Sequence, residues 1–75
     1  MAESPISNNI RTLRFFHNEM TQKELAEKVG VTRQTIVAIE NAKYSPSLEL
    51  AFRIAHIFDK PLEEVFSYDP KDEPV

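Results

Sequence analysis

The fold is decided by residues 21–41, which read TQKELAEKVGVTRQTIVAIEN. Thr21 and Glu24 have the pattern of a capping box, in which the threonine hydroxyl accepts from the Glu24 backbone N–H and the Glu24 carboxylate reaches back to the N–H of Thr21. Gly30 ends the helix that begins there, because glycine adopts the left-handed conformation without strain from a Cβ atom. Thr32 then caps a second helix, which runs to the end of the stretch. The stretch therefore predicts two short helices joined by a tight turn.

Apolar residues outside this unit predict three more helices. They recur at spacings of three and four, and the alternation typical of strands is scarce. We expect helices from residue 7 to 17 or 18, capped by Ser7 or Asn8, then over 48–58 and over 62–66. The helix over 48–58 is apolar almost all round, so it is expected in the middle of the core. We therefore predict an all-α fold of five helices.

Composition indicates one small domain with an acidic end. The chain has 75 residues, 41% of them hydrophobic, a formal net charge of −3 and no cysteine, which excludes disulfides and thiolate metal sites. Six acidic and two basic residues lie in 59–75, so that segment carries −4 and the first 58 residues carry +1. We expect an N-terminal extension over 1–7, the domain over 8–66 and a loose acidic tail over 67–75.

Several classes of protein do not fit the residues present. No apolar run approaches the roughly 20 residues that span a bilayer, and the N-terminus lacks the basic-then-apolar pattern of a secretion signal. His17 and His56 lack the spacing of metal ligands, there is no glycine-rich phosphate loop, and the adjacent Glu63 and Glu64 diverge on a helix. We expect a cytoplasmic protein that is not an enzyme and uses no metal, cofactor or small-molecule effector.

Four ordered segments carry a resemblance to a known family. They are IRTLR at 10–14, TQKELAEKVGVTRQTI at 21–36, IEN at 39–41 and PSL at 46–48. The chain resembles Cro/C1-type (XRE family) helix-turn-helix transcriptional regulators over residues 8–66, in their short single-domain form. The resemblance implies a compact five-helix lambda-repressor-like DNA-binding domain, whose second helix of the decisive stretch enters the major groove.

The resemblance also implies which residues contact DNA. Base contacts are expected from Arg33, Gln34, Thr35 and Ala38. Phosphate contacts are expected from Gln22, Thr32, Asn41, Lys43 and Tyr44. Arginine suits guanine O6 and N7, and glutamine suits adenine N6 and N7. Val37 and Ala38 are both apolar. The family often has a polar residue that contacts bases at the position of Ala38, so contact with thymine methyl groups is expected there instead.

Two structural expectations follow from the same match. Glu40 is expected to pair with Arg14. The family commonly has one residue fewer between Arg14 and Gln22, so the connection after the first helix is expected to be longer here. The extra residue makes Arg11 an alternative partner of Glu40. The usual glycine after Glu-Asn is Ala42 here. We expect positive φ at residue 41 or 42, and at Asn41 in preference, because asparagine tolerates it better.

The function expected from these features is sequence-specific binding of double-stranded DNA by a transcriptional repressor. It is expected to act as a homodimer that joins Ile57, Leu62, Val65 and Phe66, with Tyr68 beside them. Phe15 and Phe16 are expected to pack in the core, Phe16 on one stripe with Ile10 and Leu13. The alternative is a helical protein-interaction or antitoxin-like module with weak DNA affinity, which the acidic balance favours.

Overall fold

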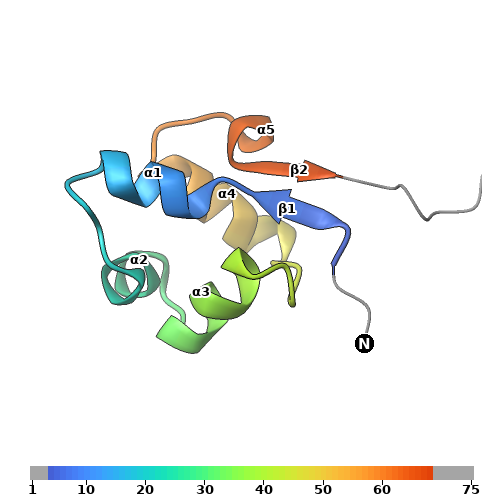
Figure 1. Cartoon of the computed structure of the whole chain (residues 1–75), viewed down its shortest axis with the longest axis horizontal. Coiled ribbons are helices and arrows are strands. Elements are labelled where there is room, and N and C mark those ends of the chain that lie inside the picture. Colours follow the sequence, from blue (N-terminus) through green and yellow to red (C-terminus); the bar gives the residue numbers. More distant parts are fainter. Residues whose placement is uncertain (1–3, 69–75) are drawn as a thin grey trace, which may run out of the picture.

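A computed structural model describes residues 4–68, which form five helices and two short strands. The elements in chain order are β1 (Ile6–Asn8), α1 (Ile10–Phe16), α2 (Gln22–Val29), α3 (Arg33–Glu40), α4 (Leu48–Ile57), α5 (Leu62–Val65) and β2 (Phe66–Tyr68). In Figure 1, α2 and α3 lie on the lower side of the molecule, and α5 and β2 lie on the upper side. The five predicted helices are present, with α4 between these two sides.

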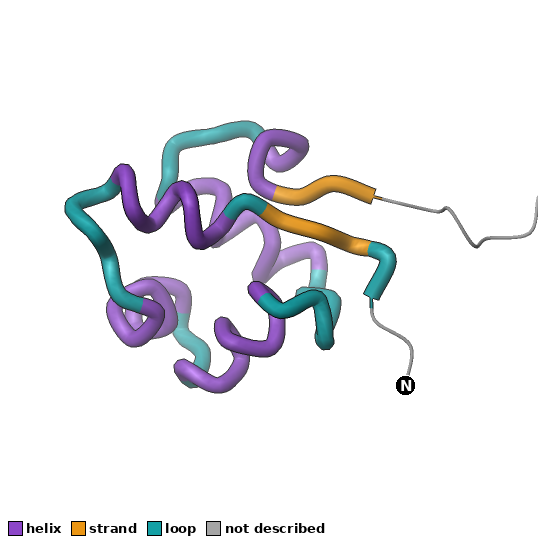
Figure 2. Tube along the Cα trace, viewed as in Figure 1, coloured by secondary structure: helices purple, strands orange, loops and turns teal. Residues whose placement is uncertain are grey.

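The fold is not strictly all-α, which corrects the prediction. Residues Ile6–Asn8 pair antiparallel with Phe66–Tyr68, and Ser7 lies opposite Ser67. The two serine hydroxyls are 2.6 Å apart, and the strand pair is visible in Figure 2. Residues 7 and 8 are therefore extended rather than helical, and the first two residues of the expected loose tail belong to a strand. The rest of that tail, residues 69–75, lies outside the described residues, as do residues 1–3.

Side-chain caps begin three of the helices as expected. The Thr21 hydroxyl accepts from the Glu24 backbone N–H, and a Glu24 carboxylate oxygen accepts from the N–H of Thr21 at 2.8 Å. Thr32 and Ser47 accept in the same way at the starts of α3 and α4. At α1, by contrast, the capping residue is Asn9, whose side chain makes no capping bond. The predicted cap Asn8 instead accepts from the backbone N–H of Ile10 at 3.1 Å.

Helix ends depend on residues with positive φ. Gly30 ends α2 at φ 82°, as predicted, and Ala42 follows α3 at φ 58°. Asn41 has φ −89°, so the preference for it was wrong. The reason is the hydrogen bonding: the Asn41 N–H still reaches the carbonyl of Val37, and the N–H of residue 43 returns to the carbonyl of residue 38. This hydrogen bond between residues 43 and 38 is the 6→1 bond of a Schellman motif, which requires the left-handed conformation at residue 42.

The core gathers residues from every helix around α4. Its largest fully buried side chains are Phe58, Ile10, Leu25, Ile36, Ile39, Ile54 and Val65. Phe15 and Phe16 are 62% and 74% exposed, so the expectation that they pack in the core was wrong. α1 has only seven residues, and the side chains on its inward face are Ile10 and, one turn later, Leu13. α4 is central but not enclosed, because Leu48 and Phe52 are exposed on its outer side.

Candidate nucleic-acid interface

The outward face of α3 is set by the two residues that anchor its inward face. Ile36 and Ile39 are buried. Each residue advances about 100° around the helix axis, so Gln34 lies opposite the midpoint of these anchors, with Val37 and Ala38 about 50° to either side of it. Gln34 is exposed and Ala38 is half-buried. The centre of the outward face of α3 is therefore Gln34, flanked by the half-buried apolar side chains of Val37 and Ala38.

Two hollows flank this face. The larger, of about 610 Å³, lies between α1, the start of α2 and α3, and its lining includes Gln22, Arg33 and Asn41. The smaller, of about 300 Å³, lies toward α4, and its lining includes Thr35 and Tyr44. The residues predicted to contact DNA are thus distributed over a central ridge and the two sides of α3.

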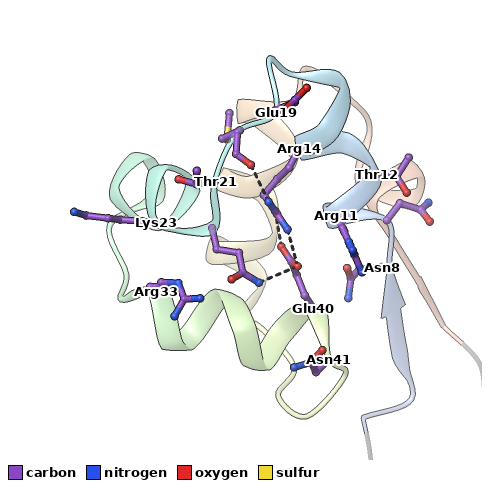
Figure 3. Close-up of a pocket in the computed structure, with 13 residues that line it drawn as sticks. Asn8, Arg11, Thr12, Arg14, Glu19, Thr21, Lys23, Arg33, Glu40 and Asn41 are labelled. Atoms are coloured by element: carbon purple, nitrogen blue, oxygen red, sulfur yellow. Dashed lines mark hydrogen bonds and ion pairs between the residues drawn. The ribbon is translucent and has the colours of Figure 1, made fainter.

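The larger hollow has an ion pair at its floor (Figure 3). Nε of Arg14 donates to Oε2 of Glu40 at 2.8 Å, and Nη2 donates to Oε1 at 3.1 Å. Nη1 of the same guanidinium donates to the backbone carbonyl of Met20 at 2.8 Å. The pair expected from the resemblance is therefore formed by Arg14, and Arg11 makes no ion pair with any described residue.

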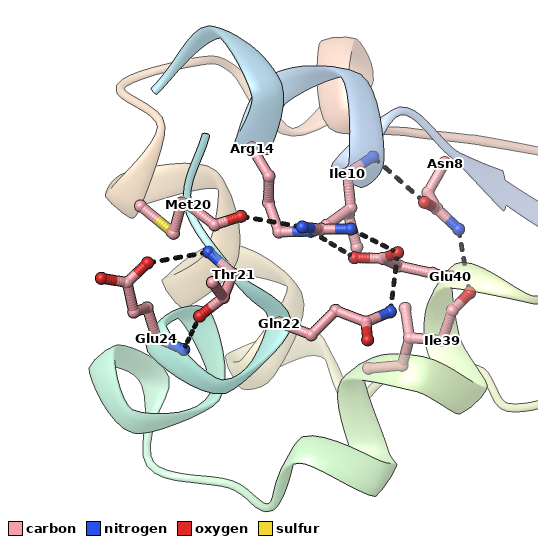
Figure 4. Close-up of polar contacts among 9 residues, drawn as sticks. All are labelled: Asn8, Ile10, Arg14, Met20, Thr21, Gln22, Glu24, Ile39 and Glu40. Carbon is pink, nitrogen blue, oxygen red and sulfur yellow. Dashed lines mark hydrogen bonds and ion pairs between the residues drawn. The ribbon is translucent and has the colours of Figure 1, made fainter. Parts of the chain in front are cut away.

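Gln22 extends this network to α2. Its side-chain amide donates to Oε1 of Glu40 at 3.2 Å, as Figure 4 shows. The network therefore joins α1, the connection that follows it, the start of α2 and the end of α3. The Arg14 and Glu40 side chains are only 14% and 8% exposed. Because each charge is bound by several partners, the network fixes the angle between the three helices without leaving a buried charge unpaired.

The residues expected to contact phosphate lie at both ends of α3. Thr32, at the start, uses its hydroxyl to accept from the backbone N–H of Thr35 at 3.2 Å. Asn41, Lys43 and Tyr44 lie at the other end, where Lys43 and Tyr44 are exposed. Backbone groups organise this second segment, because the N–H of Ser4 donates to the carbonyl of residue 42 at 2.7 Å.

Comparison with known proteins identifies the domain. Residues 10–65 match the family model HTH_3, described as helix-turn-helix. The chain belongs to this family. The Cro/C1-type resemblance expected from the sequence is confirmed.

Relatives of this helix-turn-helix protein include named regulators. An uncharacterized HTH-type transcriptional regulator of Methanocaldococcus jannaschii is 50% identical over 64 residues, which cover 85% of this chain and 96% of that protein. The cryptic phage CTXphi transcriptional repressor RstR of Vibrio cholerae is 34% identical over 61 residues, which cover 81% of this chain and 54% of that protein. The restriction-modification controller protein C.AhdI from Aeromonas hydrophila has a similar fold, with a TM-score of 0.65, 25% identity, and coverage of 73% of this chain and 82% of that one.

The expected dimer residues of this helix-turn-helix protein need one correction. Val65 has no exposed surface, because it packs into the core beside the strand pair, so it cannot contact a second copy. Ile57, Leu62 and Phe66 are half-buried and pack against the core from its edge. Tyr68 is 54% exposed.

Two kinds of feature were searched for in the part of the chain that the structure describes, a cluster of metal ligands and a membrane-spanning helix. Residues 4–68 hold no cluster of three or more histidine, aspartate or glutamate side chains that could bind a metal ion. Within the same residues, no helix is long and apolar enough to cross a membrane.

Proposed function

We propose that this chain is a transcriptional repressor that binds a specific double-stranded DNA site with α3 in the major groove. The observation that carries this proposal is the outward face of α3, with Arg33 and Gln34 exposed in its first turn. A helix fits the major groove, where each base pair presents a distinct pattern of donors and acceptors. The membership in a helix-turn-helix family and the relationship to the repressor RstR support the same function.

In this proposal the exposed side chains of α3 contact different atoms of the DNA. Gln34, at the centre of the face, would bond adenine N6 and N7, and Arg33 would reach guanine O6 and N7 from the side of the larger hollow. Ala38 would contact a thymine methyl group one turn later, and Thr35 would contact the base or sugar on the opposite side.

Phosphates would be held on both sides of α3. Gln22 uses one amide hydrogen on Glu40, and because a side-chain amide has two, the second can donate to a phosphate oxygen. Thr32, Asn41, Lys43 and Tyr44 would supply the remaining contacts with the backbone. These contacts set the register of the protein and carry no sequence preference.

We propose a homodimer as the form that binds DNA, because one helix offers few base contacts and two-fold symmetry doubles them. The two α3 helices must then lie about 34–36 Å apart, one turn of B-DNA. We propose Ile57, Leu62, Phe66 and Tyr68 as the contact surface, because they lie outside α3 and keep exposed apolar area, Tyr68 being 54% exposed and the other three half-buried. Such a protein acts in the cytoplasm, by binding and without catalysis.

A second candidate is a protein-interaction module with weak DNA affinity. It is favoured by the net charge of −3 and by the exposed Phe15 and Phe16, whose rings are in edge-to-face contact with centroids 5.3 Å apart. An exposed aromatic pair of this kind is typical of a surface that binds another protein.

The affinity for DNA separates the two candidates. Site selection from random duplexes, followed by titration of the best site and of a random duplex, measures specific and non-specific binding at the same salt concentration. The repressor proposal predicts a preference of about a thousandfold or more for the selected site. If selection yields no defined site, and binding to every duplex stays equally weak, the interaction module is the better account.

A further inference from the structure

The first residues of the described chain lie against the end of α3. Nδ2 of Asn8 donates to the backbone carbonyl of Ile39 at 2.9 Å, a bond that Figure 4 shows. Earlier in the chain, the backbone N–H of Ser4 donates to the carbonyl of Ala42 at 2.7 Å. We call residues 4–8, which include β1, the brace. The brace holds both the last turn of α3 and the loop that follows it.

The loop after α3 needs support from outside because its own backbone is unfavourable. Ala42 has a φ of 58°, and in the left-handed conformation the Cβ atom of an L-residue crowds the following carbonyl oxygen. The brace binds at this residue and just beyond it, since the Ser4 hydroxyl is also hydrogen-bonded to that of Ser45. The same loop carries Lys43 and Tyr44, to which the proposed function assigns phosphate contacts. The brace therefore stabilises the conformation that presents these two side chains.

The side-chain amide of Asn8 joins α3 to α1. Its Nδ2 donates to Ile39, and its Oδ1 accepts from the backbone N–H of Ile10 at 3.1 Å. The side chain is half-buried. One planar group thus fixes the last turn of α3 against the first turn of α1. Asparagine suits both bonds, since an aspartate in its place keeps the acceptor and lacks the donor.

The carbonyl that Asn8 binds also closes the turn at residue 42. The last four carbonyls of a helix have no partner within it. That of Ile39 is one of these, and it accepts from the Ala42 N–H at 3.0 Å as well as from Asn8. Without Asn8, this carbonyl loses its bond to β1, and the last turn of α3 can shift together with the loop. The influence of Asn8 therefore reaches Lys43 through the backbone.

We propose that Asn8 is a positioning residue for DNA binding. It acts through residues 41–44, whose side chains it holds in the orientation that binds the DNA backbone, and it contacts no DNA itself. The inference rests on the proposed function, because it requires this loop to bind phosphate. It gives the brace a part in DNA binding, in addition to its part in the strand pair.

The test compares Asn8→Ala with Asn9→Ala. Asn9 is the next residue along the chain, and its Nδ2 donates to the backbone carbonyl of Glu64 in α5 at 3.1 Å. Its replacement therefore also removes a side-chain bond to a backbone carbonyl, but leaves α3 untouched. Each variant is made alone and together with Lys43→Ala. The probe is a random-sequence duplex, titrated by fluorescence anisotropy between about 0.05 and 0.2 M salt.

The combined variant carries the decisive measurement. Lys43→Ala removes one phosphate contact, which lowers the slope of log affinity against log salt by about 0.9 and the affinity at 0.1 M salt by about eightfold. Asn8→Ala should have an effect of the same kind and of up to that size. Because both changes act through one contact, the double variant should bind about as weakly as Lys43→Ala, whereas two independent losses would multiply to about 64-fold. Asn9→Ala should keep the affinity and the slope.

A second pair of variants removes only the bond to α3. Asn8→Asp keeps the acceptor for the Ile10 N–H and loses the donor, and Asn9→Asp adds the same charge one residue away. Asn8→Asp should lower the affinity and the slope more than Asn9→Asp. Circular dichroism should show every variant folded at the assay temperature. A partly unfolded variant would lose affinity equally at all salt concentrations, so the slope separates positioning from general damage to the fold.

The outcomes distinguish this inference from the proposed function. If the wild-type protein binds duplex DNA and Asn8→Ala keeps its affinity or its slope, the assignment of Asn8 is wrong while DNA binding stands. The assignment is equally wrong if Lys43→Ala has no effect, if the effects of Asn8→Ala and Lys43→Ala multiply, or if Asn9→Ala matches Asn8→Ala. If the wild-type protein binds no duplex, the proposed function fails, and this inference fails with it.

Discussion

Replacement of Glu40 by alanine tests the ion-pair network most severely. The carboxylate accepts hydrogen bonds from Nε and Nη2 of Arg14 at 2.8 and 3.1 Å, and from the Gln22 amide at 3.2 Å. Glu40→Ala removes all three bonds. The guanidinium then keeps only its bond to the carbonyl of Met20, and its side chain is 14% exposed, so water reaches it poorly.

The cost follows from the burial of the charge that remains. Removal of one partner from a buried ion pair costs about 3–5 kcal/mol, and this pair is slightly exposed, so we expect about 3 kcal/mol. A chain of this length has a free energy of unfolding of about 4–11 kcal/mol, so the loss is a large share of it. The midpoint of thermal unfolding should fall by about 12–24 °C.

Urea unfolding followed by far-UV circular dichroism measures this loss directly. The matched control is Glu49→Ala, because Glu49 pairs with Arg53 at the surface with side chains 73% and 54% exposed. That pair is worth less than about 1 kcal/mol. If Glu40→Ala costs no more than Glu49→Ala, the network does not hold the helices together as argued.

A double variant separates the cost of the unpaired charge from the cost of lost side-chain packing. In Arg14→Met with Glu40→Leu, two apolar side chains of similar volume replace the pair, which is often close to neutral for stability. The double variant should regain part of the loss, and not all of it, because Gln22 and the Met20 carbonyl lose their partners. A double variant no more stable than Glu40→Ala would refute the assignment of the cost to an unpaired arginine.

Three more predictions concern the backbone, a cap and assembly. Ala42→Gly should raise the free energy of unfolding by about 1 kcal/mol, because Ala42 has a φ of 58°. Asn41→Gly should not raise it, because Asn41 has a φ of −89°. Equal effects of the two variants in urea unfolding would contradict this prediction. Thr21→Ala should lower it by about 1 kcal/mol through loss of the capping box, and an unchanged urea midpoint would show that the cap is dispensable. Sedimentation equilibrium should detect dimers on a palindromic duplex, and a monomer bound to one half-site would defeat the dimer proposal.

The parts of the fold that local chemistry determines were predictable from the sequence. Each side-chain cap, such as Thr21 or Thr32, involves a residue and a backbone N–H three positions later. Gly30 ends its helix because of its own conformational freedom. The Arg14–Glu40 pair spans 26 positions, and only the resemblance to a family identified it.

The strands could not be predicted in the same way. Ser7 pairs with Ser67 across 60 positions, and a segment of three residues has no period from which a strand can be recognised. The polar residues before α1 instead suggested a longer helix with an earlier cap. The exposed Phe15 and Phe16 were misjudged for a related reason, because hydrophobicity alone does not say which side of a short helix finds a core.

The division of the candidate site into a ridge and two hollows also needed the structure. The sequence places Arg33, Gln34 and Thr35 in one turn, and only the buried anchors of α3 and its neighbours show which hollow each side chain faces.

The central claim is that α3 reads DNA sequence, and comparative site selection tests it most directly. Selected sites would be compared between the wild type, Gln34→Ala, Arg33→Ala and, as a phosphate control, Lys43→Ala. We predict that each of the first two variants loses about 1–3 kcal/mol on the wild-type site and relaxes the preference at one base position. Lys43→Ala should weaken all sequences alike. If Gln34→Ala and Arg33→Ala leave both the affinity and the selected sequence unchanged, α3 is not the recognition helix.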